Sequence, residues 1–342
     1  MKRNDFRIPV IHQLEQGLSP QSETKDYYFL DYGGDFLEQQ SADGNGVVVY
    51  VCDTGIDVNH KDFEGVNFDF ERSKSFVPNE NEYIDQNFHG TFCTGIIVAQ
   101  KNGVGVVGIA KNSEIIAHKV LSSGGFGSYT WITNSAKAIL EDARIRTGKR
   151  FVINYSLGGG SGFAELERVF EELAALPNVI IVAAAGNSGR NTTDIDFPAR
   201  YKSTIAVGAV DRNKNIASFS SAGLSGDVCG AGVQVLSTSL QNSYARASGT
   251  SFSTPQVTAI VAAVWSKFKQ LSSKQIIDCL YKTVKDLGEE GLDRDYFLGV
   301  VETKAFFERA KALSEGEDEG GDKENIIKAN IQLEVEGKYY EF

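Results

Sequence analysis

Residues 47–52 read Val-Val-Val-Tyr-Val-Cys, a run of mostly β-branched side chains that begins directly after Gly46. A short apolar run bounded by glycine is typical of a strand buried on both faces of a sheet. Similar runs recur at 115–121, 151–156, 179–185 and 204–210, and segments of helical length lie between them at 89–100, 130–146 and 163–176. This alternation predicts an α/β fold with a mostly parallel central sheet and helices on both faces.

We expect residues 25–303 to form one domain, because the alternating pattern continues through this range. Residues 1–45 are polar, and we expect them to be irregular and to wrap the surface, with 1–24 as an N-terminal arm. Residues 304–342 are expected to be a C-terminal extension: a short helix, an acidic linker at 314–322, and a last segment that is either a docked strand or a disordered tail.

Composition excludes several classes of protein. The chain has 342 residues, is 42% hydrophobic and carries a formal net charge of −11 without a basic run, so it can build a large core and is not expected to bind nucleic acid. Its four cysteines are too few and too scattered for a disulfide framework or a zinc site. We expect mostly buried thiols, with one or two disulfides left open as an alternative.

The sequence shows no recognisable targeting signal. Residues 1–20 lack the apolar core of a signal peptide, and no segment is apolar for the roughly 18 residues that a membrane span needs, so no membrane partner is expected. The compartment stays unknown, since a processed mature form would be extracellular or vacuolar and any other form intracellular. We expect a monomer.

The segment Gly249-Thr250-Ser251-Phe252-Ser253-Thr254-Pro255 leads into an apolar stretch of helical length. Ser251 is therefore expected at or near a helix N-terminus, where unpaired N–H groups favour an anion and suit a nucleophile that forms an oxyanion. The alternative from this segment alone is that Thr250 or Ser251 only caps a core helix.

Three other polar side chains stand where a parallel sheet places reactive groups, beyond the carboxyl ends of strands. Asp53 follows the first predicted strand and can orient a histidine ring, although an aspartate there is also a common turn former. His89 is one of four histidines and precedes a helical stretch, and Gly90 beside it is expected to leave room for a substrate backbone. Asn187 follows the fourth predicted strand and is either an oxyanion donor or a turn residue.

Together, Asp53, His89, Asn187 and Ser251 resemble the subtilisin superfamily of serine proteases, which has the chain order Asp, His, Ser. The resemblance covers about residues 25–303 and implies a three-layer subtilisin-like fold. It rests on the motifs VVYVCDTGID, NFHGTFCTG, INYSLGGG, IVAAAGNSG, TIAVGAVDRNKNIASFSSAG and GTSFSTP. The DFEG segment and the cysteine four residues after His89 look like the proteinase K branch, whereas the loop 100–106 has the length found in bacterial subtilisins.

The resemblance implies a division of labour. Ser251 would attack the scissile carbonyl, His89 would accept and return the proton, and Asp53 would hold the imidazole. Asn187 and the Ser251 N–H would bind the oxyanion. Two segments would hold an extended polypeptide between them: Gly125, Phe126 and Gly127 on one side, and Ser156, Leu157 and Gly158 on the other. Tyr129 matches the aromatic wall of the pocket that binds the residue four positions before the cleaved bond.

Several positions depart from the pattern. Phe252 replaces the usual methionine after the nucleophile, and Phe92 replaces a common histidine. Gln256 stands where histidine is usual, and Ala231 where proline is usual before Gly232. None of these belongs to the proton relay, so we expect activity to survive. Cys93 is not a departure: the proteinase K resemblance implies that it lies under His89 as a packed thiol.

Asp196 suggests a substrate preference. The resemblance places it at the floor of the primary specificity pocket, where a buried carboxylate would favour lysine or arginine at the cleavage position. The alternative is that Arg200, close in sequence, neutralises the charge, or that the loop points to solvent.

The resemblance also implies structural Ca²⁺ at two places. Asp62 and Asn102 match side-chain ligands of the strong subtilisin site, whose other oxygens come from the loop 100–106. Asp227, with carbonyls of Lys202 and Thr204, matches a weaker site, and a plain surface aspartate is the alternative there.

The sequence therefore predicts a serine endopeptidase that cleaves extended polypeptide through an acyl-enzyme, with polypeptide substrates and a propeptide or inhibitor as expected partners. The alternative from another class is a protease-like binding or regulatory module that has the same side chains but turns over little substrate. An esterase of the α/β-hydrolase type is not supported, because no GxSxG motif surrounds Ser251.

Overall fold

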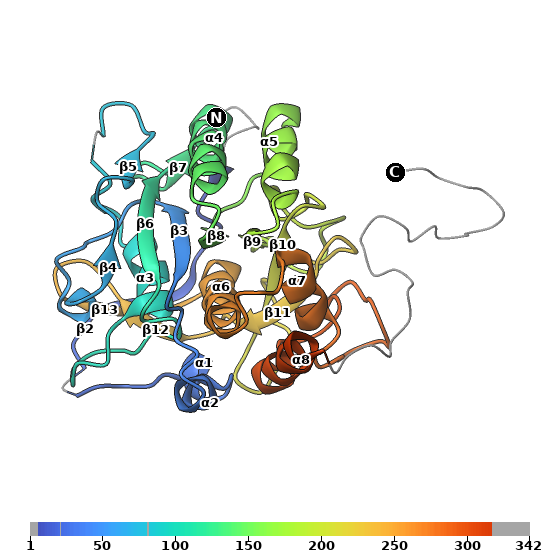
Figure 1. Ribbon diagram of the computed structural model, residues 1–342. Coiled ribbons are helices and arrows are strands. Elements are labelled where there is room, and N and C mark those ends of the chain that lie inside the picture. The colour runs from blue at the N-terminus through green and yellow to red at the C-terminus, as the bar shows by residue number, and fades with distance from the viewer. Residues whose placement is uncertain (1–5, 21, 81, 317–342) are drawn as a thin grey trace.

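The computed structural model describes residues 6–20, 22–80 and 82–316, and it confirms the predicted α/β fold (Figure 1). The central sheet has eight strands in the order β11-β10-β9-β8-β3-β6-β4, with β5 also paired to β6, and all of its strand pairs are parallel. Its strands are β3 (Val47–Asp53), β4 (Asn67–Phe68), β5 (Lys74–Ser75), β6 (Glu114–Lys119), β8 (Arg150–Tyr155), β9 (Val179–Ala184), β10 (Ile205–Val210) and β11 (Val228–Ala231).

The strand that opened the sequence argument is the centre of this sheet. All seven residues of β3 are buried, as its unbroken apolar run predicts for a strand covered on both faces. β3 pairs with β6 on one side and with β8 on the other, so the order of strands reverses at this point. In an open parallel sheet, a reversal leaves a crevice beyond the carboxyl ends of the strands, which is where ligands bind.

Helices cover the two faces of the sheet. Figure 1 shows α4 and α5 together on one side, and α6, α7 and α8 on the other. The helices are α1 (Tyr27–Leu30), α2 (Gly34–Gln39), α3 (His89–Val98), α4 (Tyr129–Ile145), α5 (Ala164–Ala174), α6 (Thr250–Lys267), α7 (Ser273–Tyr281) and α8 (Thr303–Glu315), with a 3-10 turn at Lys61–Phe63. In α6 every residue from 250 to 266 is buried, including the polar residues of its first two turns, so the helix passes through the core.

The N-terminal region differs from the expectation of an irregular wrap. A first strand, β1 (Phe6–Arg7), pairs with β7 (Phe126–Gly127), and a second strand, β2 (His12–Leu18), joins β13 (Tyr244–Ser248) beside β12 (Val235–Thr238). Helix α1 buries three aromatic side chains in the main core. The polar composition of residues 1–45 concealed these elements, because an added strand gains its stability from main-chain hydrogen bonds that require no apolar pattern.

The C-terminal helix α8 packs in the same core as the rest of the fold. Phe307 contacts the rings of Phe36 and Phe268, with ring centroids 5.3 and 4.9 Å apart. Most of the predicted acidic linker and the segment 331–336 lie outside the described residues.

All four cysteines are buried and free, which confirms the expected thiols and corrects the alternative of disulfides. Among the helices of the described ranges, none is long and apolar enough to cross a membrane.

Two departures from the family pattern are coupled in space. Gln256, buried in α6, accepts a hydrogen bond from the Ala231 N–H of the edge strand β11 at 2.6 Å, and it donates to the Tyr28 carbonyl at 3.0 Å. The usual proline at position 231 could not donate this bond, because proline has no N–H. Alanine at 231 and glutamine at 256 are therefore compatible as a pair, and the Gln256 side chain links the sheet edge, α6 and α1 by hydrogen bonds.

We predict that Ala231→Pro lowers the free energy of unfolding by about 1–3 kcal/mol, since it leaves the buried Gln256 oxygen without its donor. Urea denaturation of the full chain measures this change. The double variant Ala231→Pro with Gln256→His restores the pair of residues usual in the family, and it should recover part of the loss. If Ala231→Pro is as stable as the parent, the hydrogen bond between Ala231 and Gln256 contributes nothing to the free energy of unfolding.

Candidate active site

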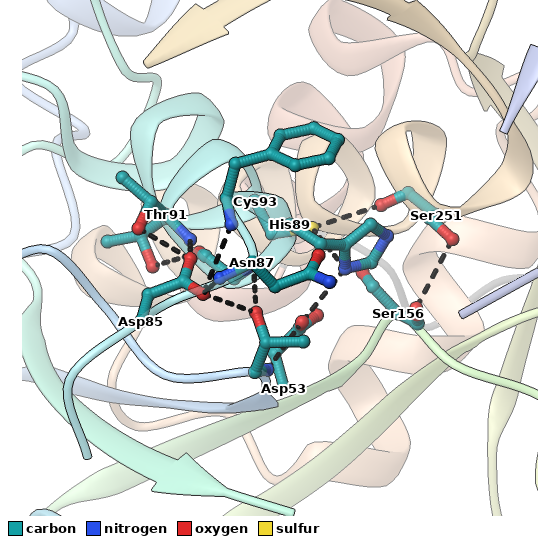
Figure 2. A network of polar contacts seen from close by, with 12 residues as sticks. Asp53, Asp85, Asn87, His89, Thr91, Cys93, Ser156 and Ser251 are labelled. Carbon is teal, nitrogen blue, oxygen red and sulfur yellow. Dashed lines mark hydrogen bonds and ion pairs between the residues drawn. The ribbon is translucent and has the colours of Figure 1, made fainter. Parts of the chain in front are cut away.

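A buried carboxylate and an imidazole meet at the carboxyl end of β3. Asp53 is the last residue of β3, His89 is the first residue of α3, and His89 Nδ1 lies 2.8 Å from Asp53 Oδ1. Both side chains are completely buried, and Figure 2 shows the contact between them. An aspartate at Nδ1 fixes the ring so that its other nitrogen can exchange a proton, and it stabilises the imidazolium form.

Ser251 lies at the start of helix α6, next to the same crevice. Gly249 is the N-cap of α6 and no side chain caps it, so the proposed capping role of Thr250 or Ser251 is wrong. The Ser251 hydroxyl donates to the Ser156 carbonyl at 3.2 Å (Figure 2). Within the described residues, His89 Nε2 is buried and has no hydrogen-bond partner. Serine and histidine are thus brought together without a hydrogen bond between them in this conformation.

Asn187 follows β9 and points its amide at the crevice. Its Oδ1 accepts from the backbone N–H of Thr250 at 2.9 Å and from the Thr250 hydroxyl at 2.8 Å, which fixes the orientation of the amide. The Asn187 Nδ2 donates to the backbone carbonyl of Val10 at 2.7 Å. The amide nitrogen of Asn187 thus donates to a carbonyl oxygen of the chain's own N-terminal segment.

That carbonyl belongs to an N-terminal segment, residues 6–10, which lies in the crevice as an added strand. Arg7 exchanges two backbone hydrogen bonds with Gly158, each 3.0 Å long, and Ile8 N donates to the Gly125 carbonyl at 3.0 Å. Phe6 pairs with Gly127 in the β1–β7 register. The two segments that the sequence predicted to hold an extended polypeptide do hold one here, and it is part of the same chain.

The side chain of Phe6 shows how this strand is anchored. Phe6 is fully buried, and its ring meets the Tyr129 ring edge-on with centroids 4.7 Å apart. The Phe163 ring lies on Tyr129 at 5.0 Å, and the Tyr129 hydroxyl donates to the Ser161 carbonyl. Tyr129 therefore contacts two aromatic rings, and one of them belongs to the N-terminal strand.

Aromatic packing replaces two usual residues beside His89. The rings of Phe92 and Phe252 lie 4.4 Å apart, and Phe252 also contacts the His89 ring at 5.6 Å. Cys93 Sγ lies 4.0 Å from His89 Nδ1 and donates to the Ser251 carbonyl at 3.4 Å, which places it where the resemblance implies. Burial raises the pKa of the Cys93 thiol well above its usual value, so it is a packed thiol rather than a nucleophile.

The role expected for Gly90 is wrong. A Cβ atom at position 90 would lie 2.1 Å from the Gly55 carbonyl oxygen and 3.2 Å from the Asp53 Cβ. Glycine is required there so that the first turn of α3 can approach the loop after β3, not to make room for a substrate. This close approach brings His89 to Asp53.

Asp196 lies between the two segments that follow β8 and β9. Cβ atoms added at Gly158 and Gly186 would lie 3.0 and 2.5 Å from its Oδ2. Arg200 pairs with Asp194 at 3.0 Å, and no ion pair or side-chain hydrogen bond to Asp196 is found in the described part of the chain. Burial raises the pKa of Asp196 to about 6, against the opposing charge of Arg7. Neutralisation by Arg200, the alternative given for Asp196, is therefore not observed.

One acidic residue of this region was missed in the sequence. Asp85, four residues before His89, accepts hydrogen bonds from five donors on the segments around Asp53 and His89 (Figure 2). An acidic side chain just before a helix start is a known signal for a capping position. The N-terminal strand was missed for another reason, since Phe6–Val10 has no periodicity that marks it.

The residues expected to bind calcium all have protein partners in this structure. Asp62 is fully buried, with Oδ1 accepting from the Tyr244 hydroxyl at 2.7 Å and Oδ2 from Val106 N at 2.8 Å. Asn102 lies on the loop 100–106, which also contains Val106. Its amide nitrogen donates to the Lys61 carbonyl at 3.0 Å, and its amide oxygen accepts from Val104 N at 3.2 Å. These bonds tie Asp62 and Asn102 to the same stretch of chain, and carboxylate and amide oxygens are ligand types that fit Ca²⁺.

Asp227 is buried, so the alternative of a plain surface aspartate is wrong. It is 2% exposed, its Oδ2 accepts from Ala206 N at 2.7 Å, and it bonds the Tyr281 hydroxyl. The hydroxyl of Thr204 bonds the carbonyls of Ala199 and Tyr201, each at 2.8 Å. These contacts make Asp227 a buried structural link between strands.

Comparison with known proteins agrees with the geometry. Residues 44–299 match the subtilase family. Subtilisin DY of Bacillus licheniformis is 39% identical over 257 residues, which cover 75% of this chain and 89% of that protein. Subtilisin of Bacillus pumilus is 40% identical over 255 residues, which cover 74% and 88%. Subtilisin E of Bacillus subtilis is 39% identical over 255 residues, which cover 74% and 64%. These relatives do not confirm the expected proteinase K branch.

Proposed function

This chain belongs to the subtilase family and is a serine endopeptidase, and on that premise we propose a role for each of four side chains. Ser251 attacks the carbonyl of the scissile peptide bond, and His89 accepts its proton and returns it to the leaving amine. Asp53 orients the imidazole. The Asn187 amide and the Ser251 N–H bind the oxyanion, and each such donor lowers the barrier by about 3 kcal/mol.

The buried 2.8 Å contact between Asp53 and His89 is the observation that carries this proposal. A carboxylate taken out of water is costly unless it is hydrogen-bonded, so its position against a ring nitrogen supports a functional pair. The Asn187 amide adds support, because it already binds a carbonyl oxygen. In this conformation the Ser251 hydroxyl bonds Ser156, and attack requires it to turn toward His89.

The N-terminal strand supports the proposed way of binding substrate. An extended polypeptide would make the backbone contacts that Arg7 and Ile8 make with Gly158 and Gly125, as an added strand. The pocket around Tyr129 would take a large apolar side chain, as it takes Phe6. A substrate competes with the chain's own segment 6–10 for this crevice, so the assay of the full chain must include a variant that weakens this segment.

We predict that a fluorophosphonate probe labels the full chain and that Ser251→Ala abolishes this labelling and lowers kcat/KM by at least about 10⁴-fold. Intact mass and hydrolysis of a chromogenic peptide measure the two effects. Phe6→Ala removes the ring contact with Tyr129 and should label faster than the parent. If neither the parent nor Phe6→Ala is labelled or cleaves peptide, the protease-like module that turns over little substrate is the better description.

We also propose a preference for lysine or arginine at the cleavage position, carried by Asp196. Its carboxylate lies between Gly158 and Gly186 and is not paired with Arg200. A charge-assisted contact to a substrate cation is worth about 1.5–3 kcal/mol. The charge of Arg7, on the segment that a substrate would replace, already acts on this carboxylate, and a lysine or arginine of the substrate would take its place.

We predict that Asp196→Asn lowers kcat/KM for substrates with lysine at the cleavage position by about 10–100-fold and leaves leucine substrates within threefold. Because the pKa of Asp196 is about 6, the lysine preference of the parent should rise between pH 5 and pH 7, as the carboxyl loses its proton. Asp194→Asn is the matched control and should keep the preference, since Asp194 pairs with Arg200. Peptide-library profiling with no gain for lysine or arginine over leucine or phenylalanine would exclude the proposal.

We propose one structural Ca²⁺ site at Asp62, Asn102 and the loop 100–106. Burial raises the pKa of Asp62, and a bound cation would stabilise its charged form. Bound Ca²⁺ would hold the loop to the 3-10 turn and would take no part in the reaction.

We predict that EDTA lowers the Tm of the full chain by about 5 °C, the size expected when a ligand present at about 100 times its Kd is removed. Added Ca²⁺ should restore the Tm, and Asp62→Asn should remove the response. Differential scanning fluorimetry measures it, with Mg²⁺ as the control ion. An unchanged Tm in EDTA would rule out the site.

A further inference from the structure

Asp85 is buried next to the proposed relay, yet it contacts neither His89 nor Ser251 through its side chain. It is 5% exposed, and no ion pair to its carboxylate is found among residues 6–20, 22–80 and 82–316. Five hydrogen bonds converge on its two oxygens. Oδ1 accepts from the Thr54 hydroxyl at 2.9 Å, Asn87 N at 2.8 Å and Phe88 N at 3.2 Å. Oδ2 accepts from the N–H and the hydroxyl of Thr91 at 3.0 and 2.7 Å.

These donors surround the point where His89 enters its helix. Phe88 is the N-cap of α3 and offers no capping side chain, so the first N–H groups of α3 need other acceptors. Asp85 accepts from Thr91 N, and the Thr54 hydroxyl accepts from Gly90 N at 2.9 Å while it donates to Asp85. A carboxylate here is also favoured by the positive end of the helix dipole.

The backbone before His89 is strained, and Asp85 holds it. Phe88 has φ 98°, a left-handed conformation that costs a residue with a side chain about 1–3 kcal/mol and persists only where its surroundings impose it. The bond from Phe88 N to Asp85 fixes this residue directly before His89. The same carboxylate holds Thr54, whose N–H bonds Asp53 Oδ1 at 2.7 Å. One side chain thus ties the histidine segment to the aspartate segment.

We propose that Asp85 is a positioning residue: it sets the orientation of His89 relative to Asp53 by fixing the start of helix α3 and the loop after β3. The inference rests on the proposed roles of His89 and Ser251. In Asp85→Asn, an NH₂ group would replace one oxygen and face at least one backbone N–H donor, so at least one of the five bonds is lost. The first turn of α3 would relax, and His89 would move with it.

Steady-state kinetics and fluorophosphonate labelling of the full-length Asp85→Asn variant test the proposal. We expect kcat to fall 10–100-fold with KM within twofold of the parent, because a misplaced base affects the chemical step more than ground-state binding. The labelling rate should fall in parallel. Phe6→Ala serves as the common background, so that occupation of the crevice by segment 6–10 is weakened equally in all proteins.

Asp293→Asn is the matched control. Asp293 is also buried and accepts three backbone N–H bonds, from Asp295, Tyr296 and Glu289, and it lies outside the proposed relay. It should lower the Tm and leave kcat within twofold. If Asp85→Asn behaves in the same way, Asp85 is only a stabilising residue and the proposal is overturned.

Thr54→Val provides the test if Asp85→Asn does not fold. It removes the hydroxyl that joins Asp85 to Gly90 N and keeps the carboxylate. A folded Thr54→Val variant should show a kcat several-fold lower at unchanged KM, and an unchanged kcat would overturn the proposal. An inactive, unlabelled background protein would instead count against the proposed function itself, which separates the two failures.

Discussion

The buried hydrogen bond between Asp53 and His89 is the interaction on which the remaining site depends. It forms because the last residue of the central strand β3 meets the first residue of helix α3, and glycine at 90 allows the helix to come close enough. Neither group is solvated, so both depend on partners supplied by the protein. The loop after β3 and the segment before α3 therefore carry a dense set of hydrogen bonds, and five of them end on the Asp85 carboxylate (Figure 2).

The crevice itself follows from the order of the strands. β3 lies between β6 and β8, so chain segments leave the sheet in both directions and open a space beyond the carboxyl ends. Ser156 follows β8 and Asn187 follows β9 on one side of this space. The backbone groups that border it are free to pair, and the chain's own residues 6–10 pair with them. An edge that can add one strand can add another, so the contacts of this segment also describe how a polypeptide substrate would bind.

The four residues that depart from the family pattern form two pairs, and the members of each pair contact each other. Phe92 and Phe252 pack ring against ring beside His89, and Ala231 and Gln256 share a hydrogen bond that proline would abolish. Each substitution looks unfavourable or neutral when its position is considered alone. In a close-packed interior the fit of one side chain depends on its neighbour, so the pair is the unit that matters.

The sequence by itself determined the α/β class, the main strands to within one or two residues, and the positions of Asp53, His89, Asn187 and Ser251. Apolar runs and glycine-bounded motifs lie within short stretches of the chain, so they can be recognised in the sequence without knowledge of the fold. Tertiary structure decided the rest: that Arg200 pairs with Asp194 and not Asp196, that Asp227 is buried, that Gly90 serves the fold, and that residues 6–10 fill the crevice. Each of these depends on contacts between segments far apart in the chain or on the direction of one side chain, which no period or motif encodes.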